Sequence, residues 1–274
     1  MRVRSQSIGL RWWGPLAWLL WLAAGCGPDG LQEDGAGAPS SAADFQVLAT
    51  QPVAGQADVP RNAPIVVRFS DLPDPAVLSY PYVSIGPRSD PVPVTQEVSL
   101  VDREVRFWPR VPLVPRTEIV VQLSRRVHSL SGRQLGTTYR VVFRTGDQVL
   151  PAQSPPSPPR LADLAGPSGP LSLSCAANGC HRRDSAGHSA AELDLAQEPR
   201  ALRDHLLSGR RSGLDALLWV EVGRPESSYL LRKLLAAQPG TFVRITGSPM
   251  PLSRSPLSVD ALRTIEAWIR TGAN

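Results

Sequence analysis

The segment "CAANGCH" holds the residues best suited to chemistry, namely Cys175, Cys180 and His181. Two cysteines with four residues between them and a histidine directly after the second suit a haem, a zinc ion or a disulfide. A disulfide across so short a loop would remove little entropy from the unfolded chain and would leave His181 without a role. A structural zinc site needs four ligands, and the one further histidine nearby is His188. Cys180 and His181 are also adjacent, which makes it hard for both to reach one small ion.

Covalent haem gives all three residues a role. The cysteines of a c-type site bond the rim of the porphyrin, and the histidine that follows reaches the iron at its centre. The known attachment pattern is Cys-x-x-Cys-His, and this chain departs from it by two additional residues between the cysteines. The haem site is therefore the prediction, and a disulfide between Cys175 and Cys180 stays open as the alternative.

Met250 is the candidate for a second iron ligand. It lies in "TGSPMPLSRSPLS" and is the one methionine of the chain besides Met1. A lone methionine before proline in a loop is not typical of core packing, where methionine fills gaps between apolar side chains. A histidine and methionine pair raises the reduction potential of a haem. His181 and Met250 are thus the predicted metal ligands.

The region that must position these residues, 171–274, shows helical periodicity. Three short helices are expected, in "EPRALRDHLLS", "ESSYLLRKLL" and "SVDALRTIEAWIRTGA". Ser258 is the predicted N-cap of the last helix, and Gly272 is its predicted stop. So few short helices leave a small aliphatic core, which a bound cofactor would complete.

An antiparallel β-sandwich is expected for residues 45–147. Apolar and polar residues alternate in "IVVRFS", "EVRFWP", "EIVVQLS" and "YRVVFRT", and turn residues separate these runs. Many short strands with no helical pattern between them indicate a sandwich. Residues 148–170 are rich in proline and are expected to form an extended, semi-rigid linker.

The first residues indicate export. Arg2, Arg4 and Arg11 precede an apolar run over residues 12–24, which is shorter than the roughly 20 residues of a membrane span. Residues 1–25 are therefore predicted to be a signal peptide. An exported chain folds in an oxidising compartment. The formal net charge is +5, and the three arginines account for most of it, which excludes the basic surface of a nucleic-acid-binding protein.

Cys26 ends the sequence "LAAGC", which resembles a bacterial lipobox. The resemblance implies that Cys26 is lipidated and becomes the first mature residue. Residues 26–44 are small and polar and are expected to form a flexible tether. The implied partner is a membrane, either the outer membrane or the periplasmic face of a Gram-negative cell envelope.

Residues 45–147 resemble the bacterial Ig-like domain of surface-layer and exported proteins, of the SbsA type. The resemblance rests on "TQPVAGQADVPRNAPIVVRFSDLPDP", "VRFWPRVPLVPRTEIVVQLSRRVHSLSGRQL" and "YRVVFRTGD". It implies a fold and the role of a spacer or adhesive module, without catalysis.

Residues 171–274 resemble the cytochrome c-like domains of exported proteins from myxobacteria and planctomycetes. The motifs are "CAANGCH", "AELDLA", "VGRPESSYLLRKL", "GSPMP" and "LSVDALRTIEAWIRTGAN". The resemblance implies Cys175 and Cys180 as covalent anchors of haem c, His181 as the proximal ligand and Met250 as the distal ligand. It also implies that Tyr229 and Trp268 pack around the haem.

The sequence thus predicts a membrane-anchored lipoprotein that transfers electrons between a single haem and a redox partner protein, and it indicates no enzyme. The alternative is a haem-free structural or adhesive lipoprotein with a Cys175–Cys180 disulfide. A third class, a catalytic haem protein such as a peroxidase, would require an open position in place of the Met250 ligand.

Overall fold

The structure is a computed structural model that describes residues 45–274 except 89, 153–155, 177–179, 213–215 and 253–254. The predicted signal peptide, Cys26 and the tether lie outside the described residues. In the described part of the chain, no helix is both long enough and apolar enough to cross a membrane. Residues 43–274 form one compact unit.

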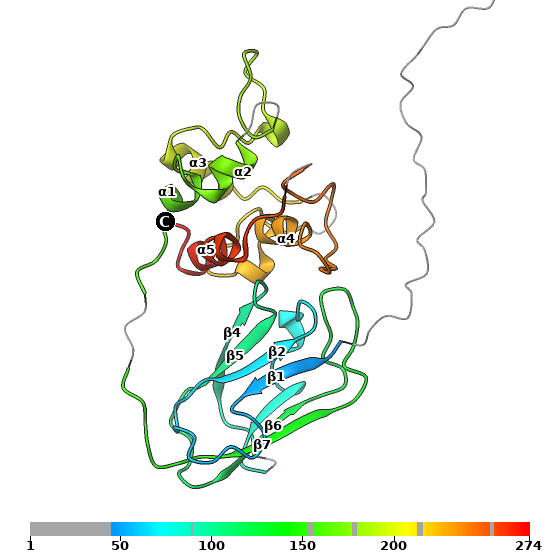
Figure 1. The fold of residues 1–274 in the computed structure, drawn as a ribbon, viewed down its shortest axis with the longest axis vertical. Helices are drawn as coiled ribbons and strands as arrows, with labels where there is room; N and C mark the ends of the chain where they lie inside the picture. The colour runs from blue at the N-terminus through cyan, green and yellow to red at the C-terminus, as the bar shows by residue number, and fades with distance from the viewer. Residues whose placement is uncertain (1–44, 89, 153–155, 177–179, 213–215, 253–254) are drawn as a thin grey trace, which may run out of the picture. The chain divides into compact units, whose positions relative to one another are not determined.

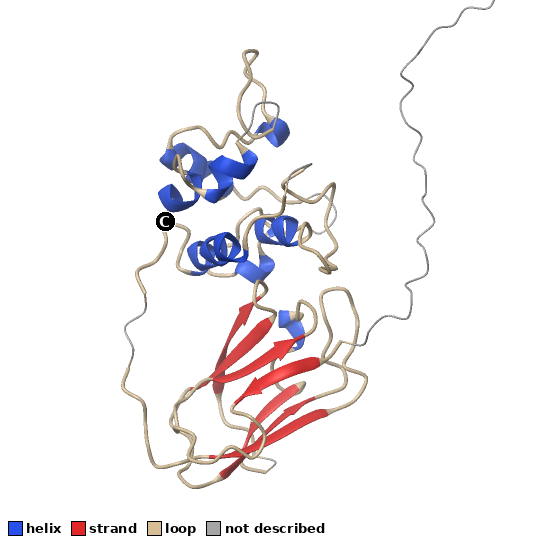
Figure 2. Ribbon diagram, viewed as in Figure 1, coloured by secondary structure: helices blue, strands red, loops and turns tan. Residues whose placement is uncertain are grey.

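Two antiparallel sheets build the first half of this unit (Figures 1 and 2). The first sheet has the order β1-β2-β5-β4, and its strands are β1 (Val47–Gln51), β2 (Ile65–Phe69), β5 (Glu104–Pro109) and β4 (Val94–Ser99). The second has the order β3-β6-β7, with β3 (Val83–Gly86), β6 (Glu118–Leu123) and β7 (Tyr139–Arg144). A single 3-10 turn, η1 (Pro75–Val77), follows β2.

The predicted alternation is confirmed in the strands. Ile65, Val67 and Phe69 of β2 are buried, and Val67 lies opposite Val105 of β5 in the antiparallel register. In β6 the neighbour Val120 is also buried, so this strand is apolar on both faces for part of its length. The buried positions of the strands are therefore rich in β-branched and aromatic side chains, which suit a pleated surface.

Five short helices follow, α1 (Leu161–Ala165), α2 (Pro170–Cys175), α3 (Pro199–Leu206), α4 (Tyr229–Leu235) and α5 (Val259–Arg270). The 3-10 turns η2 (Ala190–Glu192) and η3 (Pro225–Ser227) lie between them. The three predicted helices are present as α3, α4 and α5. The hydroxyl of Ser258 accepts a hydrogen bond from the amide of Ala261 at 3.2 Å, which confirms the predicted cap.

Helical structure begins earlier than the sequence indicated. Helix α1 lies inside the stretch 148–170, for which an extended linker was expected, and its Leu161 and Leu164 are buried. The carboxylate of Asp163 accepts a hydrogen bond from the amide of Arg160 at 2.7 Å, and so stabilises the start of this helix. The segment that remains outside sheets and helices before α1 is correspondingly shorter.

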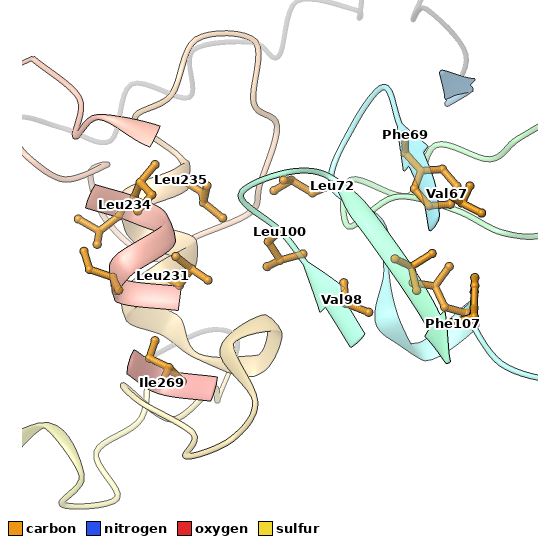
Figure 3. Packing of buried hydrophobic residues seen from close by; sticks show 14 of the residues in the cluster. Val67, Phe69, Leu72, Val98, Leu100, Phe107, Leu231, Leu234, Leu235 and Ile269 are labelled. Atoms are coloured by element: carbon orange, nitrogen blue, oxygen red, sulfur yellow. The ribbon is translucent and has the colours of Figure 1, made fainter. Parts of the chain in front are cut away.

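The sandwich and the helices contact each other through α5 and the turn between β4 and β5. The carboxylate of Glu266 accepts hydrogen bonds from the hydroxyl of Ser99 at 2.7 Å and from the amide of Leu100 at 2.8 Å. Leu100 and the helix residue Ile269 are fully buried. Figure 3 shows these two residues among the buried apolar side chains of the sandwich and of the helices.

Candidate functional site

A cavity of about 440 Å³ lies among the helices, and Cys175, His181 and Met250 all line it. Its volume is within the range of ligand sites, which is roughly 300–1,000 Å³. Most of its wall is apolar and comes from aliphatic side chains, among them Leu171, Leu193, Leu195, Leu206 and Leu234. The fold therefore brings three of the predicted haem residues to one apolar space.

Cys175 is placed at the cavity by the end of α2. It is the last residue of that helix, and its side chain is buried. The backbone then turns back, since the amide of His181 donates to the carbonyl of Cys175 at 3.1 Å. Residues 177–179, between the two cysteines, lie outside the described part. Cys180 is half-buried beside His181, and it is not among the described residues that line the cavity.

The ring of His181 is oriented by the backbone. Its Nδ1 lies 3.0 Å from the carbonyl oxygen of Ala190. A carbonyl oxygen only accepts, so this contact assigns the proton to Nδ1 and leaves a lone pair on Nε2. A histidine that ligates a metal through Nε2 usually donates its Nδ1 proton to a backbone carbonyl or a carboxylate. The main chain of His181 is held as well, because its carbonyl accepts from the amide of Leu195 at 2.8 Å.

Helix α4 supplies the opposite part of the lining. Tyr229 and Lys233 are four residues apart, as are Leu230 and Leu234, so each pair lies on one side of the helix. All four line the cavity. Met250 is attached to the same helix through its amide, which donates to the carbonyl of Lys233 at 3.2 Å.

Among the lining residues that were not predicted from the sequence, Trp219 and Lys233 carry polar groups. Trp219 lines the cavity, and its ring lies 5.6 Å from that of His205 on α3. Lys233 places an ammonium group there, which donates to the hydroxyl of Tyr229 and to the carbonyl of Thr246, both at 3.0 Å. Lys233 is the single lysine of the chain, and that rarity is the one signal that could have marked it.

Trp268 does not lie where the resemblance implied. It is fully buried in α5, and its indole nitrogen donates to the carbonyl oxygen of Asn274 at 3.0 Å. It is absent from the described lining of the cavity, whereas Tyr229 is part of it. The cause is the position of Trp268 on the helix face that packs against the last residues of the chain.

His205 of α3 packs against Trp219. Its ring stacks at a tilt on Trp219, and its Nε2 is buried without a hydrogen-bond partner among the described residues. Burial lowers the pKa of His205, and the nearby charge of Arg210 lowers it further, while Glu192 opposes this shift.

The described residues contain no group of three or more His, Cys, Asp or Glu side chains that could hold a metal ion. A zinc site would require such a group, whereas a pair made of His181 and Met250 would not form one. In the structure neither Cys175 nor Cys180 takes part in a disulfide.

A comparison with protein families finds a match for the β-sandwich. Residues 41–145 match the family model described as a bacterial Ig-like domain. This segment is a bacterial Ig-like domain. The match covers less than half of the chain and does not reach the helices or the cavity. No curated protein matches the chain.

Several solved structures resemble part of the chain. They include an L,D-transpeptidase from Mycobacterium smegmatis (17% identity, 37% of this chain and 40% of that one, TM-score 0.28). An alpha-2-macroglobulin from E. coli is 19% identical over 39% of this chain and 6% of its own, with a TM-score of 0.31. CopC from Methylosinus trichosporium OB3b is 19% identical over 39% of this chain and 99% of its own, also with a TM-score of 0.31. The chain thus spans less than half of the transpeptidase and a small part of the macroglobulin, and at these TM-scores the likeness says nothing about function.

Proposed function

We propose that this chain is an exported, lipid-anchored protein whose helical region binds one covalent c-type haem and transfers electrons. The observation that supports the proposal is the shared cavity of Cys175, His181 and Met250, in which Met250 comes from a part of the sequence distant from the other two. A thiol, an imidazole with its Nε2 lone pair available and a thioether face one apolar space. The packing of a small helical core does not require a thiol, an imidazole and a thioether at one place.

The residues present fit a haem. Cys175 and Cys180 would form the two thioether bonds, His181 would ligate the iron through Nε2, and Met250 would supply the second axial ligand. The bound haem would provide a one-electron redox couple at its iron. The aliphatic wall would exclude water from the iron and from its ligands, which favours the less charged, reduced state and so raises the reduction potential.

The remainder of the chain would carry the haem region. Cys26 would attach it to a membrane through lipid, and a redox partner protein would exchange electrons with it. The bacterial Ig-like domain is of a type common in bacterial surface proteins. Its contact with α5 through Glu266 would make it a base for the helical region. We propose no catalytic turnover of a substrate.

The test is to export the full chain in a host that attaches c-type haem and to record a haem-stained denaturing gel and a reduced absorption spectrum. We expect a stained band in the wild type and none in Cys175→Ser with Cys180→Ser. His181→Gln should keep covalent haem but lose the spectrum of an imidazole-ligated iron. His188→Gln is the matched control, because His188 is exposed in the same loop, and it should behave as wild type.

A colourless wild-type protein with an oxidised Cys175–Cys180 pair would overturn the proposal. It would support the second candidate, a haem-free structural or adhesive lipoprotein, which the bacterial Ig-like domain favours. In that case the four-residue spacing between the cysteines would explain why the haem was not attached.

A further inference from the structure

The cavity contains a positive charge for which the described residues provide no acidic partner. Lys233 lines the cavity at a half-buried position, and no ion pair found among the described residues includes it. Its ammonium donates to the Tyr229 hydroxyl and to the Thr246 carbonyl, each at 3.0 Å. The Lys233 nitrogen also lies 5.2 Å from the centre of the Tyr229 ring.

These partners are neutral. The hydroxyl of Tyr229 donates its own proton to the carbonyl of Thr246, so it meets Lys233 with a lone pair. An ammonium group has three protons to donate, and these two bonds use two of them. The cluster of Lys233, Tyr229 and Thr246 therefore keeps its full positive charge and one remaining donor beside an apolar wall.

A cation in such surroundings is costly unless an anion accompanies it. The described residues supply none, although several cations elsewhere do pair with carboxylates, as Arg210 does with Glu192 at 3.0 Å. The wall around Lys233 is apolar and so selects a mostly apolar ligand. An apolar ligand that carries an acid group would satisfy both features.

We propose that Lys233 binds a carboxylate of the ligand that occupies this cavity. The inference rests on the proposed function, since haem is an apolar ring with two propionate groups. It places one propionate at the Lys233 ammonium, where Tyr229 and Thr246 hold the charge in position. The carbonyl of Lys233 accepts the Met250 amide, so the same residue holds the acid group through its side chain and the Met250 loop through its backbone.

Arg211 is the other cation in the lining, and it is less suited to this role. Its side chain is exposed, and its guanidinium donates to the carbonyl of Ala216. Lys233, in contrast, is carried by a helix, and both of its hydrogen bonds are made inside the site. We therefore expect selectivity for the acid group to depend on Lys233.

The test uses the full chain, produced without haem-attachment machinery and kept reduced, and two probes, haemin and haemin dimethyl ester. The ester has the same ring but no charged carboxylate. Wild type should bind haemin about tenfold or more tightly than the ester, since a charge-assisted hydrogen bond contributes about 1.5–3 kcal/mol. Lys233→Met should remove this preference by weakening the binding of haemin, and Lys233→Arg should retain part of it.

Arg200→Met removes an exposed charge of α3 that does not line the cavity, and as the control it should keep the wild-type preference. Equal affinity of wild type for both probes would overturn the role of Lys233 and leave the haem site standing, and this comparison needs no variant. A preference for haemin over the ester that survives in Lys233→Met would also overturn the role of Lys233 and leave the haem site standing. Binding of neither probe by wild type would overturn the proposed haem site itself, so the two failures are distinguishable.

Discussion

Met250 is held beside the cavity by a backbone hydrogen bond to α4, and its side chain is half-buried. A thioether ligand stabilises the reduced iron more than it stabilises the oxidised iron, so in the proposed haem site the pair of His181 and Met250 would favour a high reduction potential. Met250→Ala should therefore keep covalent haem and lower the potential. A redox titration of the exported holoprotein measures this change.

The same variant distinguishes electron transfer from the peroxidase alternative. In wild type the iron should have no open position, and added imidazole should leave the spectrum unchanged. In Met250→Ala imidazole should bind. A wild-type protein that already binds imidazole readily would show that Met250 is not a ligand.

His205 provides a pH-sensitive contact at the cavity wall. Burial against Trp219, with Arg210 nearby, lowers its pKa in the folded protein. In the unfolded chain His205 has its ordinary pKa of about 6.5. As the pH falls through this value, the unfolded chain therefore binds more protons than the folded protein, and the free energy of unfolding decreases. His205→Phe should reduce this acid sensitivity between about pH 7.5 and pH 5.5, as urea unfolding at several pH values would show.

His188→Gln is the control for this experiment, because His188 is exposed. An unchanged pH dependence in His205→Phe would mean that other groups cause the acid sensitivity.

At the scale of elements, the start of α5 depends on one hydroxyl. Ser258 accepts from the Ala261 amide, and Asp260 in the first turn adds a favourable charge to the helix dipole. Ser258→Ala should lower the free energy of unfolding by about 1 kcal/mol. Chemical denaturation measures this loss, and Ser258→Asp should restore most of it. A loss in the aspartate variant equal to that in the alanine variant would contradict a capping role.

The sequence was sufficient to predict the strands and helices that have a repeated pattern of apolar residues or a clear cap. Alternation predicted β2 and β5, and the cap at Ser258 predicted α5. It was not sufficient for α1, which is one short turn in a proline-rich stretch. Its stability comes from burying Leu161 and Leu164 against distant residues, and a local pattern does not contain that information.

The same limit applies to the site. Residue type and spacing singled out Cys175, His181 and Met250, and all three line the cavity. Trp219 and Lys233 were missed, since lining a cavity depends on how loops return to it. Trp268 was misplaced, because an aromatic residue on an amphipathic helix packs against whichever apolar neighbour the fold supplies.

At the scale of the whole molecule, a buried carboxylate connects the two halves. Glu266 receives hydrogen bonds from Ser99 and Leu100, and Arg270 lies 3.5 Å away. Arg263 of α5 adds a surface contact to Asp102 at 2.7 Å. The hydrogen bonds and Arg270 favour the charged form, yet burial has the larger effect and raises the pKa of Glu266.

This shift has a consequence for stability. The folded protein holds the Glu266 proton more tightly than the unfolded chain does. The stability gained in this way is present below the unfolded pKa, about 4.5, and is lost as the pH rises through the higher folded value. Glu266→Gln should therefore become more stable relative to wild type as the pH rises from about 4 to 8, as denaturant unfolding would show.

Glu198→Gln is the control for this comparison, since Glu198 is exposed. A constant difference between wild type and Glu266→Gln over this pH range would show that folding does not shift the pKa of Glu266.

The helical region also closes on itself. The amide of Leu161, its first helical residue, donates to the carbonyl oxygen of Asn274 at 3.0 Å, and Trp268 donates to that same oxygen. A segment whose two ends meet can be spliced into a surface loop of another protein without stretching the host chain. The two ends of residues 160–274 thus lie close enough together for the segment to be inserted into a surface loop of another protein, by recombination or by design.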